Sequence, residues 1–180
     1  AQAADATTAA VKEYRDVEDK FALKIPADWE MATGATTPNP QSSRRVTAFY
    51  PPGNPDVNVS VVCTGTGADY TRMGSFGSPF EFGQGVVTGM TRPKPKQGPA
   101  QFSELLDAAS VGDKYFLEYT VERPSDGFFQ HLTSTIGLGY NGRVGRLYTL
   151  TAVCPEDQYA AQKTTLKAIM ATFELPPTLF

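Results

Sequence analysis

The sequence predicts an α+β fold with a central, mainly antiparallel β-sheet, and three observations support this class. Four consecutive segments between residues 102 and 153 are rich in β-branched and aromatic residues and alternate apolar with polar side chains. Short turns containing Gly, Pro, Asn or Asp separate these segments, as is typical of antiparallel neighbours. Two helix-like segments lie between and after the strand blocks. We therefore expect helices to cover the sheet.

The chain of 180 residues has the length of one domain. We predict a flexible N-terminal segment over residues 1–13 and a single domain over residues 14–180. The chain opens with AQA, the small-residue pattern that signal peptidases read. This start is either the remnant of an export signal or an ordinary frayed terminus.

The first half of the chain predicts three strands. In residues 14–25, Phe21, Leu23 and Ile25 alternate with less apolar positions, which indicates a half-buried strand. Residues 45–50 and 57–64 are predicted as two further strands, joined by the turn PPGNPD. The intervening segment ATGATTPNPQSS has no periodic apolar face, so we expect it to form an exposed, mobile loop.

Two helices are predicted from their start signals. Ser78, followed by a proline and then by Glu81, forms a capping box, and the helix should end near residue 90. Its three glycines weaken it, so tertiary packing must hold it. Residues 155–172 predict a second helix, because Glu156 and Asp157 lie at the positive end of its dipole and apolar side chains recur on one side.

The four later strands are expected at residues 102–111, 114–122, 128–138 and 143–153. The Asn141-Gly142 pair between the last two is a strong short hairpin signal. A short strand, FEL, and a proline-bearing tail complete the chain.

Composition argues against two classes of partner. The net charge of −3 and the pI near 5.2 provide no overall field to attract phosphate backbones, so no nucleic-acid partner is expected. No apolar run reaches the roughly 18 residues of a spanning helix, so we expect no transmembrane segment.

The two cysteines, Cys63 and Cys154, each lie at the end of a β-like run. They are either bridged or separately buried as small hydrophobic side chains. Neither belongs to a C-x-x-C pair, so a cysteine-based metal site is not expected.

His131 is the only histidine, so a nucleophile–histidine relay has a single possible base. Strand alternation puts His131 on the face of Phe129 and Thr133, where it is either a hydrogen-bonded structural group or a metal contact with a nearby acid. The acid pairs Glu18–Asp19 and Glu156–Asp157 are interpreted as solvated charges. No catalytic set emerges, so we expect docking onto a partner protein, not catalysis.

A small basic patch, Arg92, Lys94 and Lys96, is interleaved with prolines. It either docks on an acidic partner surface or is merely a solvated loop.

Over residues 14–175 the sequence resembles the PsbP family of thylakoid-lumen extrinsic proteins of photosystem II, with its PsbP-like and PsbP-domain relatives. The segments FALKIPADWE, NVSVVCTGT and FGSPFEFGQGVV are similar to the early strands and first helix of that family. The run from KYFLEYTVE to GRLYTLTA resembles its C-terminal strands.

The resemblance implies an α-β-α sandwich, a location in the chloroplast thylakoid lumen peripheral to the membrane, and no enzymatic activity. It implies docking on photosystem subunits at the lumenal membrane surface, either in the oxygen-evolving complex or during photosystem assembly. One alternative is an assembly factor for photosystem I or for the NDH complex. The other is a divalent-metal-binding or metal-dependent small-molecule protein that uses His131 and a carboxylate. We expect the free chain to be a monomer.

Members of the family retain calcium at the manganese cluster and can bind a divalent metal through a strand histidine and a nearby acid. The matching positions here are His131 with Glu156 or Asp157, so no cofactor is required but calcium, manganese or zinc is possible. The cysteines depart from the main PsbP protein, which suggests a PsbP-like or PsbP-domain paralogue. Together with the oxidising lumen, they lead us to expect a disulfide between Cys63 and Cys154.

Overall fold

The computed structural model describes residues 10–179 except 36–43, 68 and 94–97. Within these ranges all strand pairs are antiparallel, and the main sheet has the order β3-β4-β5-β9-β8-β7-β6. Its strands are β3 (Glu30–Ala35), β4 (Arg45–Tyr50), β5 (Asn58–Gly65), β6 (Phe102–Val111), β7 (Lys114–Arg123), β8 (Phe128–Tyr140) and β9 (Gly145–Pro155). The predicted α+β class with a mainly antiparallel sheet is confirmed.

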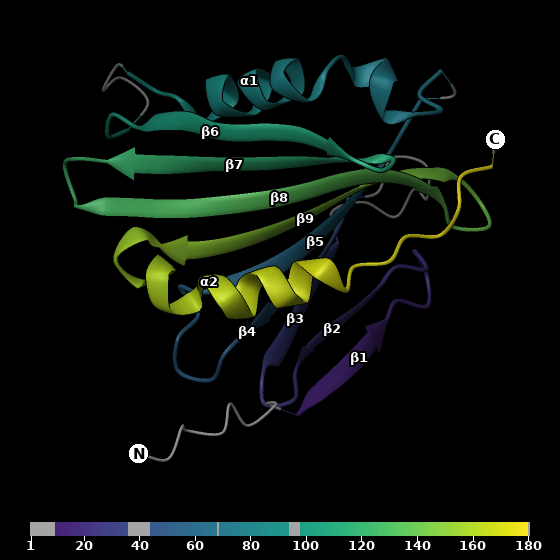
Figure 1. Cartoon of the computed structure of the whole chain (residues 1–180), viewed down its shortest axis with the longest axis horizontal. Helices are drawn as coiled ribbons and strands as arrows, with labels where there is room; N and C mark the ends of the chain where they lie inside the picture. Colours follow the sequence, from purple (N-terminus) through teal and green to yellow (C-terminus); the bar gives the residue numbers. More distant parts are fainter. Residues whose placement is uncertain (1–9, 36–43, 68, 94–97, 180) are drawn as a thin grey trace.

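The remaining elements cover this sheet. A separate hairpin is formed by β1 (Val11–Arg15) and β2 (Ala22–Pro26). The helices are α1 (Pro79–Met90), preceded by a 3₁₀ turn at Met73–Phe76, and α2 (Glu156–Ala171). Figure 1 shows α1 beside β6 and α2 crossing the sheet over its middle strands.

Helix α1 begins as the sequence predicts. The Ser78 side chain accepts a hydrogen bond from the Glu81 backbone N–H, and the Glu81 carboxylate accepts one from the Ser78 N–H. Inside the helix, a Cβ added at Gly83 would lie 2.9 Å from the Leu105 methyl groups on β6. This close approach is the packing that holds a glycine-rich helix on the sheet.

Two hydrophobic cores lie on opposite faces of the sheet. One core joins α2 and the β1–β2 hairpin to β5 and β9, around buried Phe21, Val59, Leu150 and Leu166. The other joins α1 to β7 and β8, around buried Leu117, Tyr119 and Ile136. Because each helix covers a different half of the sheet, the face of β6 and β7 opposite α1 is left without a helix (Figure 1).

Three boundaries predicted for the N-terminal third are wrong. Residues 14–25 form a hairpin, not one strand, because the chain reverses between Asp16 and Phe21, where Lys20 adopts a positive φ of 64°. The folded domain starts before residue 14, because Val11–Glu13 already pair with β2. The expected loop after Met31 is strand β3 as far as Ala35, held by pairing with β4. Residues 1–9 and 36–43 lie outside the described residues.

The strand FEL is reduced to a single bridge between Glu174 and Ala22. The tail after it crosses the end of the sheet, where the Tyr140 N–H donates to the Pro177 carbonyl.

No helix in the described part of the chain combines the length and apolar character needed to cross a membrane.

Candidate functional site

His131 lies between two carboxylates that come from different elements. Its Nδ1 is 2.8 Å from Glu156 Oε2 at the start of α2, and its Nε2 is 3.1 Å from Glu118 Oε2 on β7. The imidazole is buried, whereas the two carboxylates remain partly exposed. Both ring nitrogens donate to these carboxylates when the ring is protonated.

The face of the imidazole is also covered. Tyr159, one turn into α2, stacks on His131 with ring centroids 3.6 Å apart and an interplanar angle of 9°. Burial, followed by the nearby Glu118 and Glu156 carboxylates, raises the pKa of the Tyr159 phenol. A histidine whose two nitrogens and one ring face are occupied is held rigidly, and it is poorly placed to act as a general base.

Strand register produces this arrangement. His131 is directly opposite Thr120 on one side and Cys154 on the other, so the short step from Cys154 to the helix start brings Glu156 to the Nδ1 atom of the ring. Glu118 lies opposite Thr133, on the same face as His131. The predicted face shared by Phe129, His131 and Thr133 is confirmed.

The structure brings together only part of the predicted metal set. Glu156 contacts His131, whereas Asp157 is exposed and forms no hydrogen bond or ion pair with His131. No group of three or more His, Cys, Asp and Glu side chains within the described residues is arranged to hold a metal ion. Sequence reasoning missed Glu118, although alternation along β7 and the register with β8 would have pointed to it.

The expected disulfide between Cys63 and Cys154 is wrong. Both thiols are free and buried. Cys63 is directly opposite Tyr148, while Cys154 lies near the far end of the same strand β9. At about 3.3 Å per residue the two Cα atoms are roughly 20 Å apart, whereas a disulfide needs less than about 7 Å.

Both cysteines are held as protonated thiols, which react slowly. Burial raises the pKa of Cys154 to about 11, and burial also raises the pKa of Cys63 well above its ordinary value.

Arg92, from the predicted basic patch, forms a backbone bridge with Gln101 and donates to its side-chain oxygen at 3.2 Å. Lys94 and Lys96 lie outside the described residues.

A second charged cluster lies at the other end of the β8–β9 pair. Asp19 is fully buried and accepts hydrogen bonds from Arg45, Asn141 and Arg146 at 2.6 to 3.0 Å. Arg45 also donates to both oxygens of Asp16. The interpretation of Glu18–Asp19 as solvated charges is therefore wrong for Asp19, because the β1–β2 turn directs its carboxylate inward.

The comparisons with known proteins reported below agree on one protein family, PsbP. The family model described as PsbP matches residues 9–175. The chain is 35% identical over 164 residues to the Arabidopsis thaliana protein "PsbP domain-containing protein 3, chloroplastic", a match that covers 91% of this chain and 64% of that protein. It is 32% identical over 123 residues to "CyanoP" of Thermosynechococcus vestitus, covering 64% of this chain and 63% of that protein.

The chain thus spans less than two thirds of the length of these curated relatives. Among solved structures, the solution structure of cyanobacterial PsbP (CyanoP) from Synechocystis sp. PCC 6803 is similar, with a TM-score of 0.68 and 19% identity over 93% of both chains. This similarity supports the fold described above.

Proposed function

The chain belongs to the PsbP family, and from this premise we propose that it is a non-enzymatic protein of the thylakoid lumen that docks on photosystem II. The family match over residues 9–175 is the observation that carries this proposal. Relatives whose names place them in chloroplasts or describe them as CyanoP support a role in photosynthesis. The finer assignment, stabilisation of the oxygen-evolving complex or assistance in its assembly, is part of the proposal.

The geometry around His131 supports binding over catalysis. The only histidine of the chain is fixed by Glu118, Glu156 and Tyr159, so it does not face a cavity as a free base. Both cysteines are buried as protonated thiols, which are poor nucleophiles. These are the side chains that common nucleophilic mechanisms would use.

Capture from photosynthetic membranes tests the proposal. Affinity-tagged chain is incubated with detergent-solubilised thylakoids, recovered on resin and analysed by mass spectrometry, with the tag alone as the control. We expect enrichment of photosystem II subunits. Enrichment of photosystem I or NDH subunits instead would support the alternative assembly role, and recovery of no photosynthetic subunit would contradict both.

Divalent-metal binding is a second candidate function, and the distance between His131 and Glu118 favours it. Nε2 of His131 and Oε2 of Glu118 are 3.1 Å apart, close to the separation of two adjacent ligands on an octahedral cation with bonds of about 2.1 Å. Glu156 would then hold the Nδ1–H and fix the ring, as carboxylates commonly do behind metal-bound histidines. Water would complete such a site.

Calorimetric titration with Mn²⁺ and Zn²⁺ tests this candidate. We expect binding to weaken by at least tenfold in Glu118→Gln, since one of the two protein ligands is lost. Asp157→Asn is the matched control, because it removes an exposed acid that does not contact His131, and its affinity should equal that of the wild type. Equal affinity in all three proteins would rule out this site.

A further inference from the structure

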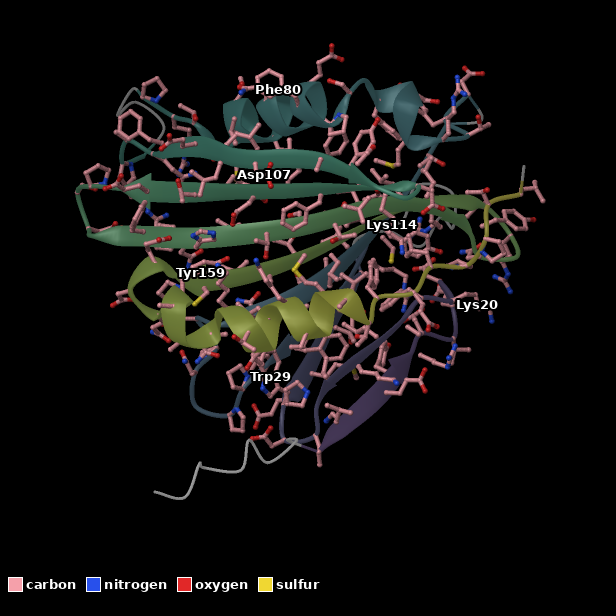
Figure 2. All side chains as sticks on the ribbon, viewed as in Figure 1. Lys20, Trp29, Phe80, Asp107, Lys114 and Tyr159 are labelled. Carbon is pink, nitrogen blue, oxygen red and sulfur yellow. The ribbon has the colours of Figure 1, made fainter. Side chains whose placement is uncertain are left out.

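Among the described residues, the part of the sheet over β6 and β7 has no helix on the side that α2 occupies. Helix α2 packs on β9, β8 and β2 but leaves β6, β7 and the start of β8 uncovered on its side of the sheet. Figure 2 shows this area between the labelled Asp107 on β6 and Tyr159 on α2, without a helix in front of it. We call it the open face, and its residues are Phe102, Glu104, Asp107, Glu118, Glu122 and Phe129.

Strand register shows that these side chains share one side. Glu118 contacts His131 on the α2 side, and Glu122 lies four positions further along the same strand. Asp107 is directly opposite Glu118, because the irregularity after Leu105 resets the register of β6. Glu104 is opposite Thr120, which in turn is opposite His131.

Negative charge on the open face is not balanced. In the part of the chain that the structure describes, Glu104, Asp107 and Glu122 form no ion pair, and His131 is the sole basic side chain in their cross-strand rows. Carboxylates placed directly opposite each other, as Asp107 and Glu118 are, destabilise a sheet.

Among the described residues, two further basic side chains near the open face form no ion pair with these acids. Arg123, also on β7, points to the other side of the sheet and pairs with Asp126 and the Phe128 ring. The ammonium of Lys163 on α2 lies 5.9 Å from the Tyr159 ring centre and is in no ion pair with an acid of the described residues.

Aromatic side chains flank the charges. Phe102 and Phe129 both lie opposite Glu122, one on each side, and they are 46% and 38% exposed. Leu106, the unpaired residue of the β6 irregularity, is also exposed. Exposed aromatic groups gathered on one surface are typical of a protein interaction site.

A hollow extends the open face at the start of α2. It has a volume of about 630 Å³, and its lining includes Asp56, Phe129, Glu156 and Asp157. The carboxylates and the aromatic ring together suit a long cationic side chain, whose methylene stem packs on the ring while its charge meets the acids.

We propose that the open face binds a cationic, partly apolar segment of another protein. Charge complementarity selects this occupant, because a neutral apolar segment would bury unpaired carboxylates. An anionic membrane surface or a nucleic acid would be repelled. Asp107, which lies opposite the Glu118 carboxylate and forms no ion pair among the described residues, is stabilised when a Lys or Arg side chain of the partner approaches it.

This inference deepens the proposed function. It rests on one part of that proposal, namely that the chain acts by docking on other proteins. It gives the partner contact a chemical character, a positive segment, and it gives this chain the acidic side of the interface.

A peptide titration tests the open face without any photosystem component. The probe is a fluorescein-labelled peptide in which lysine alternates with valine, and fluorescence anisotropy reports binding. The test variant is Glu104→Gln/Asp107→Asn/Glu122→Gln. The control variant, Asp28→Asn/Glu30→Gln/Asp113→Asn, removes the same number of exposed acids away from the open face.

We expect the test variant to bind about tenfold more weakly, as expected for the loss of three exposed charge contacts, and the control variant to bind like the wild type. A peptide with glutamate in place of lysine should not bind. Equal affinity of both variants, or no saturable binding to the wild type, would overturn the inference. Failure to capture photosystem II with peptide binding intact would instead count against the proposed function alone.

Discussion

The two charged clusters at opposite ends of the β8–β9 pair differ in how their charges are balanced. At one end, Asp16 and Asp19 face Arg45 and Arg146, and both Asp19 and Arg146 are almost completely buried. At the other end, the carboxylates around His131 outnumber the basic groups and stay partly exposed. Figure 2 shows Lys20, next to Asp19, and Tyr159 far apart along the sheet.

This difference teaches which cluster serves folding and which is available for binding. Buried charges must be compensated within the chain, and the first cluster meets this need by fastening the β1–β2 turn to β4 and β9. Partly exposed carboxylates are solvated by water, so they can remain uncompensated until a partner supplies the opposite charge. We therefore expect mutations in the first cluster to change stability and mutations in the open face to change binding.

The largest expected effect is the removal of Asp19. Asp19→Ala leaves Arg146 buried without its carboxylate, and loss of one partner from a buried pair costs about 3–5 kcal/mol of unfolding free energy. Urea unfolding measures this change. Glu18→Ala is the matched control, because the neighbouring carboxylate is largely exposed and its removal should cost less than about 1 kcal/mol. Similar losses in both variants would contradict the structural role of Asp19.

His131→Gln should have an intermediate effect. It removes the group that joins β8 to Glu118 and Glu156, and loss of such hydrogen bonds costs about 1–3 kcal/mol. The cost stays below that of Asp19→Ala because both carboxylates can be rehydrated. Urea unfolding of the two variants side by side checks this order, and a larger loss for His131→Gln would reverse our comparison.

Acid should weaken the balanced cluster through Asp16. Burial alone would raise the pKa of Asp16, but hydrogen bonds from Arg45 and from the Asp19 N–H hold it below its ordinary value. The unfolded chain therefore takes up this proton first, so the contribution to stability is present above about pH 4 and is lost as the pH falls below it.

Urea midpoints measured between neutral and acidic pH test this contribution. The difference between wild type and Asp16→Asn should shrink as the pH falls. A difference that is independent of pH would show that Asp16 does not titrate in this way.

The smallest expected effect has the opposite sign. Asp107→Asn relieves the like-charge contact with Glu118, so we expect a gain of a few tenths of a kcal/mol. Thermal unfolding at low ionic strength is the measurement, with Asp113→Asn in the β6–β7 turn as the control. A loss of stability in Asp107→Asn alone would mean that this carboxylate has a structural partner.

Much of the sheet was predictable from sequence because local signals determine it. The alternation in β6 to β9, the Asn141-Gly142 turn and the capping box of α1 each depend on neighbouring residues. The hairpin at Asp16 to Phe21 was missed because a non-glycine residue, Lys20, takes the positive φ. Strand β3 was missed because pairing with β4 holds a segment that has no buried side chain.

The candidate site was only half predictable for a similar reason. His131 and Glu156 were expected, but the contribution of Glu118 depends on the pairing of β7 with β8, and the separation of Asp157 depends on where α2 begins. The burial of Asp19 and the distance between Cys63 and Cys154 are also consequences of long-range register. Composition and spacing do not reveal such contacts.

Carbodiimide cross-linking tests the central claim most directly, because it joins carboxylates to lysine amines in contact with no added spacer. The chain is bound to solubilised thylakoid membranes, treated with the carbodiimide and digested, and mass spectrometry identifies the linked peptides. We predict that Glu104, Asp107 and Glu122 link to lysines of a photosystem subunit. Cross-links to such a subunit that come only from acids outside the open face would contradict the account.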